Sequence, residues 1–399
     1  MKISEAVILV GGLGSRLGKI TNKIPKPLIF IDNKRFLDYL LTKITKYNFN
    51  TIYLLCSYKK ELFFKLYHNK QIHNSKIICI NEGYRKGTGG ALYKLKKKIK
   101  KNFLLLNGDT FFDIDLNNFL NKKISNYYGI LALTNKKNSI HNNLLINLKI
   151  NQKNILSYSN KKNFLMNGGV YLLNKKIFNK IENVNMSLED DILDNLILNK
   201  KIKAYYYKDK FIDIGSTNKL DFIKKNSNFI KNKTFFFDRD GVINKNDGYI
   251  VDYKKFKFLK GVKTAIKYLN DKRYLVIIVT NQACVGKSLL TEKKLLDIHK
   301  KMKYSIYNFN KGIIDDVFYS PYYKHSKKNK YRIGRYDRKP NPGMFFKAFK
   351  KWNVNIEKSL FIGDRYTDQI AAKKSKIKFY LKKNVSLYKQ VKEIIKNEK

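Results

Sequence analysis

The feature of this sequence that most constrains its fold is the segment Phe235–Gly248, FFFDRDGVINKNDG. Three aromatic residues in a row predict a short strand with both faces covered, as in a parallel sheet. Asp238 and Asp240 follow the strand, and side chains two positions apart on a strand point the same way. The two carboxylates would repel each other unless a cation lay between them, so the pattern indicates a metal site. A surface turn is the alternative, because Asp and Gly are common turn residues.

The length of 399 residues predicts two domains. In the first half, short apolar runs alternate with helical patterns, which is typical of an α/β domain with a mainly parallel sheet. The expected strands of this half are Ala6–Val10, Thr51–Ser57, Lys76–Asn81, Phe103–Leu106, Ile130–Thr134, Val170–Leu173 and Phe211–Ile214. The expected helices are Phe36–Tyr47 and Leu188–Leu198.

A polar stretch between Leu220 and Thr234 is suited to a linker, and we place the domain boundary near residue 230. This division gives domains at 1–229 and 230–385, followed by a lysine-rich tail at 386–399 with the pattern of a surface helix. The second half again alternates strands and helices, so we expect two Rossmann-like α/β domains. Its expected elements are Thr234–Phe237, Val262–Asn270, Tyr274–Thr280, Glu292–Tyr307, Asp316–Tyr319, Gly343–Trp352, Leu360–Gly363 and Ile377–Leu381.

The formal net charge of +52 raises the question of nucleic-acid binding. Lysine is spread over nearly every segment rather than gathered in one stripe, so we expect no specific nucleic-acid partner. The excess charge should still attract anionic ligands and cause weak, salt-sensitive association with polyanions.

The apolar runs and the cysteines indicate the cellular compartment of the protein. No apolar run approaches the roughly 20 residues that cross a bilayer, and the opening residues MKISEAVILVGG resemble a strand rather than a secretion signal. Cys56, Cys79 and Cys284 have no paired spacing, which argues against a disulfide framework and a cysteine zinc site. We therefore expect a cytoplasmic protein without a membrane span. The oligomeric state stays open, a homo-oligomer included.

A glycine loop with Gly11, Gly12 and Gly14 follows the first expected strand. Glycines let the backbone approach a phosphate closely and expose amide groups to it. Arg16 and Lys26 could neutralise a nucleoside triphosphate and its pyrophosphate leaving group. The loop is neither a dinucleotide fingerprint, which needs glycine where Leu17 stands, nor a P-loop, which needs glycine in place of Leu13.

This loop resembles the signature of the sugar-1-phosphate nucleotidyltransferases, whose further motifs follow in order. The resemblance implies a GT-A-like sheet, with Arg16 and Lys26 as catalytic residues. The aspartates Asp109 and Asp213 match the family's metal ligands, where Mg²⁺ neutralises crowded oxygens while a sugar-phosphate oxygen attacks the α-phosphorus. One departure is Asn160, where the family usually has Glu. The resemblance implies nucleotide or sugar contacts for Gly11, Gly12, Gly14, Glu82, Gly87, Thr88, Gly89, Asn107, Lys161, Asn167 and Gly168.

Motifs of the second half follow an order that resembles the haloacid dehalogenase superfamily, each at the carboxyl end of a strand. The resemblance implies that Asp238 is the nucleophile and that Asp240 is the general acid and then the base. Mg²⁺ would be bound by Asp238, the carbonyl of Asp240, and Asp364. The remaining implied roles are a phosphoryl contact for Thr280, charge compensation by Lys339, orientation of the site by Asp368, and substrate contacts by Asn281 and Arg338.

Further motifs of the second half indicate which branch of this superfamily it resembles. DRDGVIN, the following GYI, VTNQ and RKPNPGM together resemble the heptose bisphosphate and histidinol phosphate phosphatases. That branch often carries a zinc clip of three cysteines and one histidine before its RKP motif. Residues 320–337 contain no cysteine and only His325, so we expect no zinc.

Together, the two resemblances imply consecutive steps of heptose nucleotide-sugar biosynthesis for lipopolysaccharide or another cell-surface glycan. The second half would remove the 7-phosphate of heptose 1,7-bisphosphate, and the first would couple heptose 1-phosphate to a nucleotide, with GTP favoured. The alternative enzyme is a mannose- or glucose-1-phosphate nucleotidyltransferase fused to a phosphatase for another small ester, such as histidinol phosphate. The alternative of another class is a non-catalytic polyanion-binding protein, against which the clustered carboxylates argue.

Overall fold

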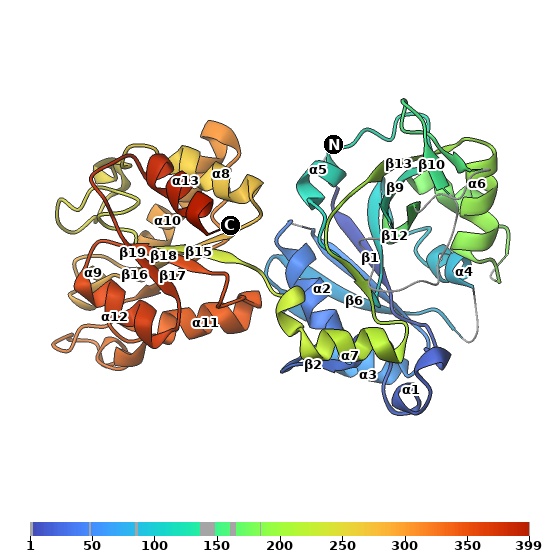
Figure 1. Ribbon diagram of the computed structural model, residues 1–399. Coiled ribbons are helices and arrows are strands. Elements are labelled where there is room, and N and C mark those ends of the chain that lie inside the picture. The colour runs from blue at the N-terminus through green and yellow to red at the C-terminus, as the bar shows by residue number, and fades with distance from the viewer. Residues whose placement is uncertain are drawn as a thin grey trace. The chain divides into compact units, whose positions relative to one another are not determined.

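The computed structural model describes residues 3–47, 49–83, 87–135, 148–159, 165–183 and 185–398. The chain divides into two compact units, Met1–Ile230 and Lys231–Lys399. Each unit has its own sheet, and helices pack against that sheet (Figure 1). No helix among the described residues is both long and apolar enough to cross a membrane.

The first unit is built on a ten-stranded mixed sheet in which β7, β1, β4 and β6 are parallel neighbours. Each expected strand of this half overlaps an observed one, and most strands of the sheet run in one direction, but the sheet is mixed rather than wholly parallel. The reason is that β12 runs antiparallel to both β7 and β9. The strands are β1 (Glu5–Leu9), β4 (Thr51–Cys56), β5 (Gln71–Ile72), β6 (Ser75–Asn81), β7 (Phe103–Asn107), β9 (Gly129–Asn135), β10 (Leu148–Ile150), β11 (Leu156–Tyr158), β12 (Leu165–Leu173) and β13 (Ile202–Tyr206).

Alternating side chains of the central strand divide the core of this unit between the two sheet faces. Ala6 and Ile8 join one apolar cluster, and Val7 joins another on the opposite face. Two short antiparallel pairs, β2 (Phe30–Ile31) with β3 (Lys34–Arg35) and β8 (Thr110–Phe112) with β14 (Phe211–Asp213), complete the strands. The helices are α1 (Lys19–Lys23), α2 (Phe36–Thr45), α3 (Lys60–Tyr67), α4 (Thr88–Tyr93), α5 (Leu116–Leu120), α6 (Asp194–Leu198) and α7 (Thr217–Lys225).

Two expectations for helical segments of the first unit need correction. Only the first part of the stretch expected to be a linker is helical, because α7 extends to Lys225. The stretch is also not fully exposed, since Leu220, Ile223 and Ile230 are buried in the core of this unit. The helix expected over Leu188–Leu198 begins with a π-helical turn, Leu188–Leu193, before α6.

The second unit is a five-stranded parallel sheet in the order β17-β16-β15-β18-β19. The aromatic strand is at its centre, as a strand buried on both faces must be: Phe235 and Phe237 face one apolar cluster and Phe236 the other. The strands are β15 (Thr234–Phe237), β16 (Leu275–Asn281), β17 (Asp316–Ser320), β18 (Leu360–Gly363) and β19 (Lys378–Leu381).

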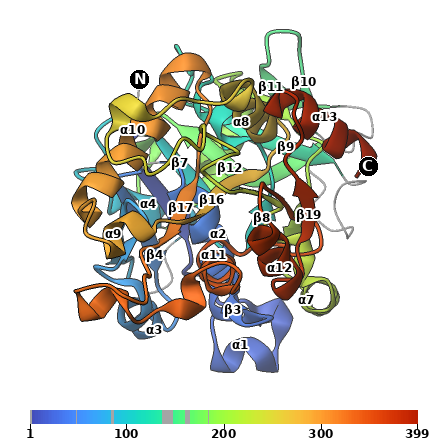
Figure 2. The same cartoon turned by 90° about the vertical axis from the view of Figure 1, so that its left-hand side faces the viewer.

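Helices cover both faces of this second sheet. The first cluster includes residues of α8, α10 and α13, and the second those of α11 and α12, on opposite sides of the strands (Figures 1 and 2). The helices are α8 (Val262–Asp271), α9 (Ala283–Gly286), α10 (Glu292–Asn310), α11 (Gly343–Trp352), α12 (Tyr366–Lys374) and α13 (Leu387–Asn397).

The lysine-rich segment that ends the described chain contributes to the core of the second unit. Its helix α13 is amphipathic: Leu387, Val391, Ile394 and Ile395 are buried, whereas most of its charged side chains are exposed. These four residues belong to the same apolar cluster as Phe235 and Phe237 of β15. Residues 386–399 therefore contain an integral layer of the fold.

This packing predicts the effect of a single truncation in α13. Val391 is fully buried, so Val391→Ala should lower the free energy of unfolding of the second unit by roughly 1–3 kcal/mol, through lost burial and the cavity left behind. Lys392→Ala, at the exposed neighbouring position, is the control and should change it by less than about 0.5 kcal/mol. Denaturant unfolding measures both variants; equal effects would mean that α13 does not pack on the core as described.

Candidate active sites

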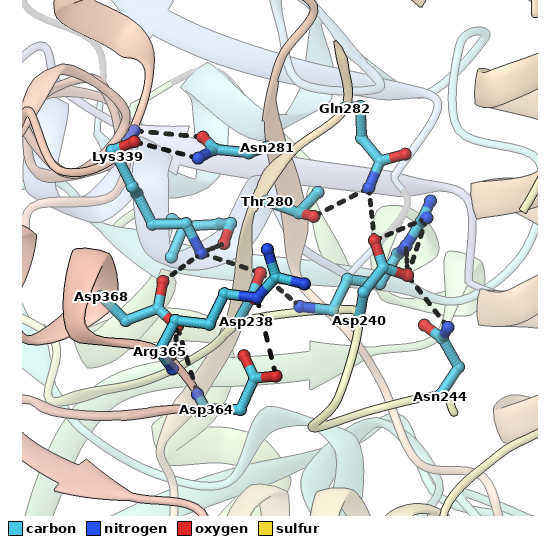
Figure 3. Close-up of polar contacts among 12 residues, drawn as sticks. Asp238, Asp240, Asn244, Thr280, Asn281, Gln282, Lys339, Asp364, Arg365 and Asp368 are labelled. Atoms are coloured by element: carbon cyan, nitrogen blue, oxygen red, sulfur yellow. Dashed lines mark hydrogen bonds and ion pairs between the residues drawn. The ribbon is translucent and has the colours of Figure 1, made fainter. Parts of the chain in front are cut away.

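Three carboxylates meet at the carboxyl edge of the second sheet. Asp238 follows β15 and Asp364 follows β18, and these strands are parallel neighbours. Asp368, on the first turn of α12, joins them: the three residues each place one carboxylate oxygen within 4.8 Å of the others (Figure 3). The backbone amide groups of Asp364 and Arg365 both donate to Asp368 Oδ2, at 3.1 Å, which fixes that side chain. Asp368 therefore orients the segment that carries Asp364.

The ammonium group of Lys339 compensates part of this negative charge. Lys339 is 3% exposed, and its Nζ lies 2.8 Å from Asp238 Oδ1 and 2.7 Å from Asp368 Oδ1. It also donates to the carbonyl oxygen of Val279 at 2.9 Å. Three acceptors use all three donors of the ammonium group. Asn281 holds the lysine backbone in place through two 3.0 Å hydrogen bonds, one to the carbonyl and one from the amide.

One lysine does not balance the negative charge of three carboxylates. Burial raises the pKa of Asp238 above its usual range despite the opposing effect of Lys339. Burial and then the charge of Asp368 raise the pKa of Asp364 as well. In addition, Asp364 Oδ1 is buried and has no hydrogen-bond partner among the described residues. An oxygen-rich cluster with an unpartnered oxygen fits a hard divalent cation such as Mg²⁺.

The carboxylate of Asp240 does not point to the same place as that of Asp238, contrary to the expectation from the sequence. Its carboxylate instead accepts hydrogen bonds from Arg239, from Asn244 Nδ2 at 2.9 Å and from Gln282 Nε2 at 2.8 Å (Figure 3). The strand ends at Phe237, so the two-residue alternation of a strand does not extend to Asp240. The side chain is thereby held beside the acidic cluster rather than within it.

The other predicted residues of the second unit lie around this cluster. Thr280, at the end of β16, is buried and its hydroxyl accepts a hydrogen bond from Gln282 Nε2 at 3.0 Å. Arg338 donates to the carbonyl oxygen of Tyr322 at 3.3 Å, which ties it to the loop after β17. Both are therefore held by contacts within the protein.

In the first unit, the glycine loop is held by local hydrogen bonds and packs against a lysine. Gly14 has φ +72°, and the hydroxyl of Thr21 donates to the carbonyl oxygens of Gly14 and Gly18, each at 3.0 Å. An added Cβ at Gly14 would lie 2.9 Å from Lys26, whose Nζ is 3.4 Å from Asp109 Oδ2. Lys26 thus lies between the glycine loop and one of the two predicted metal ligands, and Gly12 borders open space.

Pairing of β8 with β14 brings the two predicted metal ligands of the first unit together. Asp213 ends β14 opposite Thr110, and the Ile214 amide donates to the carbonyl oxygen of Asp109 at 2.9 Å. Lys219, on α7, forms a buried ion pair with Asp213. Arg16 lies beside the same aspartate, because an added Cβ at Gly215 would contact both side chains, Asp213 Oδ1 at 2.7 Å and Arg16 Nη2 at 3.4 Å. Three cationic side chains therefore surround the two acids.

A partly buried hydrogen-bond network supports the predicted nucleotide and sugar segments. Thr88 donates to Glu189 Oε2 at 2.9 Å, and the hydroxyl of Tyr171 donates to Glu189 Oε1 at 3.2 Å. Asn167 Nδ2 in turn donates to that hydroxyl at 2.7 Å.

Three glycines of the predicted nucleotide and sugar segments lie too close to neighbouring atoms to carry a side chain. An added Cβ would lie 2.1 Å from Met186 O at Gly87, 2.7 Å from Ile192 at Gly89, and 2.4 Å from Phe112 at Gly168. Asn107 packs under Gly169, and its Oδ1 is buried without a partner among the described residues. Lys161, like Asn160, lies outside the described residues.

Comparisons with known proteins agree with this geometry. The nucleotidyl transferase family matches residues 5–233, more than half of the chain. A D-glycero-alpha-D-manno-heptose 1-phosphate guanylyltransferase from Aneurinibacillus thermoaerophilus is 35% identical over 215 residues, which make up 53% of this chain and 93% of that protein. The chain belongs to the nucleotidyl transferase family.

The second unit matches phosphatases. The polynucleotide kinase 3 phosphatase family matches residues 233–386. A D-glycero-beta-D-manno-heptose-1,7-bisphosphate 7-phosphatase from Rhodopseudomonas palustris is 37% identical over 138 residues, 35% of this chain and 76% of that protein. The protein is therefore a bifunctional enzyme, with a nucleotidyltransferase unit and a haloacid dehalogenase-like phosphatase unit.

Solved structures match each unit separately. HddC from Yersinia pseudotuberculosis, crystallised with GMP-PN, is 28% identical; the match covers 56% of this chain and 100% of that one, with a TM-score of 0.47. D,D-heptose 1,7-bisphosphate phosphatase from B. bronchiseptica, crystallised with magnesium and phosphate, is 22% identical; the match covers 41% of this chain and 99% of that one, with a TM-score of 0.36.

Several residues of both sites were not identified from the sequence. In the nucleotidyltransferase unit they are Lys219 and Glu189, and in the phosphatase unit Arg239, Asn244 and Gln282. Lys219 has no distinguishing signal, because lysine occurs in nearly every segment of the chain. Gln282 did have a distinguishing signal, because it directly follows Thr280 and Asn281 at the end of a strand.

The position of Gly241 yields a test of the acidic cluster. Gly241 has φ +86°, and an added Cβ would lie 2.1 Å from Asp364 Oδ2. Gly241→Ala must displace that carboxylate, so we expect phosphatase activity to fall by about 100-fold or more while nucleotidyl transfer persists.

Gly334→Ala is the matched control. Gly334 has φ +84°, and an added Cβ there meets nothing closer than 3.9 Å, so this variant introduces the backbone strain without the clash. Steady-state phosphate release measures both variants. Equal losses would attribute the effect to backbone strain and contradict the clash with Asp364.

Proposed function

We propose that this enzyme carries out two consecutive steps of heptose activation. The phosphatase unit would hydrolyse the 7-phosphate of heptose 1,7-bisphosphate, and the nucleotidyltransferase unit would couple the resulting heptose 1-phosphate to GMP from GTP. The supporting observation is chemical continuity: removing the 7-phosphate from heptose 1,7-bisphosphate gives heptose 1-phosphate. The guanylyltransferase relative is named for the alpha anomer of that product, and phosphatase relatives are named for the beta anomer, as in Rhodopseudomonas palustris, or for the alpha anomer, as in Burkholderia mallei.

The arrangement around Asp238 suits a covalent phosphoryl intermediate. An Asp238 carboxylate oxygen would attack the phosphorus of the ester, and the sugar oxygen would leave with a proton from Asp240. Water would then attack the aspartyl phosphate, give its proton to Asp240 and release inorganic phosphate. Lys339 holds Asp238 at 2.8 Å and would offset the charge that accumulates there. Asp240 would have to turn from its present contacts with Arg239 and Gln282 to reach the leaving group.

The nucleotidyltransferase unit suits attack on an α-phosphorus. A phosphate oxygen of the sugar 1-phosphate would displace pyrophosphate from the nucleoside triphosphate. Arg16 and Lys26, held beside Asp213 and Asp109, would neutralise the triphosphate and the departing pyrophosphate. The segments around Asn107 and Asn167 would receive the sugar.

Mg²⁺ is the proposed cation of both units. Asp238 and Asp364 would bind it in the phosphatase unit together with the carbonyl of Asp240, and Asp109 and Asp213 in the other. When bound, it would neutralise phosphoryl oxygens. We also propose that the phosphatase unit needs no zinc, since the segment 320–337 has no cysteine. The segment 320–337 is instead held in place in part by Tyr331, whose hydroxyl donates to Glu292 Oε2 at 3.2 Å.

The experiment that tests the proposal separates the two half-reactions. Asp238→Asn removes the charge of the nucleophile but keeps its shape, so phosphate release from heptose 1,7-bisphosphate should fall by about three orders of magnitude or more. Pyrophosphate release from heptose 1-phosphate and GTP should persist. Asp109→Ala should do the reverse, because it removes a proposed metal ligand.

Mixing the two variants is the internal control. An equimolar mixture should make the nucleotide sugar from bisphosphate and GTP through free heptose 1-phosphate, although neither variant does so alone. If Asp238→Asn abolished both half-reactions in a folded protein, the two sites would not be independent and the proposal would fail.

Metal analysis tests the zinc prediction. The purified protein should contain no stoichiometric zinc, and a zinc-selective chelator should leave phosphatase activity unchanged, whereas removal of Mg²⁺ should abolish it. One tightly bound zinc per chain would show that other residues replace the missing cysteines.

A further inference from the structure

A buried lysine is paired with one of the two predicted metal ligands of the nucleotidyltransferase unit. Lys219, on the first turn of α7, and Asp213, at the end of β14, are each 8% exposed. Lys219 Nζ forms an ion pair with Asp213 Oδ2, and the backbone amide of Gly215 donates to Asp213 Oδ1 at 3.0 Å. Both carboxylate oxygens of Asp213 therefore have a partner within the protein.

The packing of α7 holds this lysine in place. Its neighbours Leu220 and Ile223 are buried in the core of the first unit, and the amide of Leu220 donates to the carbonyl oxygen of Ser216 at 3.0 Å. The backbone of Lys219 is therefore fixed beside the end of β14, and the ion pair is part of the packed site. Removing one partner of such a pair leaves a buried charge without compensation.

The two units differ in the charge that surrounds their acids. In the phosphatase unit three carboxylates face two cationic side chains, the buried Lys339 and the exposed Arg365. In the nucleotidyltransferase unit two carboxylates face three cationic side chains, which are Lys26, Lys219 and Arg16. Within the described part of the chain, no third acid, histidine or cysteine gathers with these two carboxylates. Without a ligand, this site therefore offers no net negative charge to a divalent cation.

We propose that Lys219 keeps Asp213 from binding a divalent cation until a nucleoside triphosphate is present. A cation at Asp213 Oδ2 would lie next to the ammonium group, where buried surroundings screen their repulsion poorly. The triphosphate brings the negative charge that offsets both cations. This inference rests on the proposed function for the metal site itself, and it adds the residue that determines when that site fills. Lys219 is thus a positioning residue that acts through Asp213.

Mn²⁺ is the probe for this competition, because carboxylate sites that suit Mg²⁺ also bind Mn²⁺ and its electron paramagnetic resonance signal distinguishes free from bound ion. The full-length protein is titrated with Mn²⁺ without nucleotide. Lys219→Met removes the competing ammonium group, so it should bind Mn²⁺ at one site about 10-fold more tightly than wild type, or more. The double variant Lys219→Met with Asp213→Asn should lose this gain, which would assign it to Asp213.

Two single variants are the controls. Lys224→Met makes the same change at an exposed position of α7 and should bind Mn²⁺ as wild type does. Asp213→Asn alone should leave the Mn²⁺ titration of the nucleotide-free protein unchanged, because Lys219 already excludes the ion from Asp213. It should, however, weaken binding of the Mn²⁺–GTP complex by about 10-fold or more, since a metal ligand is then missing.

Thermal unfolding gives a second measurement that does not depend on activity. In EDTA, Lys219→Met should lower the Tm of the nucleotidyltransferase unit by roughly 5 °C or more, because Asp213 is left buried without its cation. Added Mn²⁺ should restore much of this loss, since an ion that binds only the folded state stabilises it. Lys219→Gln is a second variant in case the first fails to fold: its amide can still donate to Asp213, and it should also bind Mn²⁺ more tightly than wild type.

The outcomes distinguish this inference from the proposed function. If wild type makes no nucleotide sugar with any triphosphate, the proposed function fails. If Asp213→Asn weakens Mn²⁺ binding by the nucleotide-free protein, or if neither Lys219→Met nor Lys219→Gln gains affinity, Lys219 does not control the site and the inference is wrong. If Asp213→Asn also leaves the affinity for the Mn²⁺–GTP complex unchanged, the proposed metal site itself is wrong, and this inference with it.

Discussion

Repulsion among clustered carboxylates is the constraint on which both sites depend. In each unit, residues that follow or end strands bring acids close together. Acids in such a cluster are stable only when cations or donors compensate them. In the phosphatase unit Lys339 supplies part of this charge from the loop before α11, and in the nucleotidyltransferase unit Lys26 and Lys219 supply it from separate elements. In the phosphatase unit the positive charge does not balance all of the negative charge, and Asp364 Oδ1 has no partner among the described residues. This excess of negative charge suits the site to a divalent cation and, with it, a phosphate ester.

The two units meet this constraint in different ways. The phosphatase sheet is wholly parallel, so Asp238 and Asp364 arrive at one edge simply as residues that follow neighbouring strands. The nucleotidyltransferase sheet is mixed, and its two aspartates are paired by the separate β8–β14 ribbon.

Much of this arrangement could be predicted from the sequence, and the exceptions have physical reasons. FFFDRDG predicted a strand buried on both faces with Asp238 at its end, because burial and strand-end acids leave local signals. The resemblance to the haloacid dehalogenase superfamily implied that Asp364 joins it. The direction of the Asp240 carboxylate could not be predicted, since it depends on Asn244 and Gln282, which approach from elsewhere. The antiparallel course of β12 depends on long-range contacts in the same way. Lys219 lies close to Asp213 in the sequence, but no signal sets it apart from the many other lysines of the chain. The polar composition around α7 concealed a helix whose apolar residues face the core.

The central claim is that one chain holds two chemically consecutive sites joined by a freely released sugar 1-phosphate. A time course of ³¹P magnetic resonance on wild-type enzyme with heptose 1,7-bisphosphate, GTP and Mg²⁺ tests it most directly. The 7-phosphate signal should decay first as inorganic phosphate appears. The heptose 1-phosphate signal should then rise and fall as pyrophosphate and the nucleotide sugar form. A nucleotide sugar that still carried its 7-phosphate, or nucleotide transfer without prior phosphate release, would contradict the account.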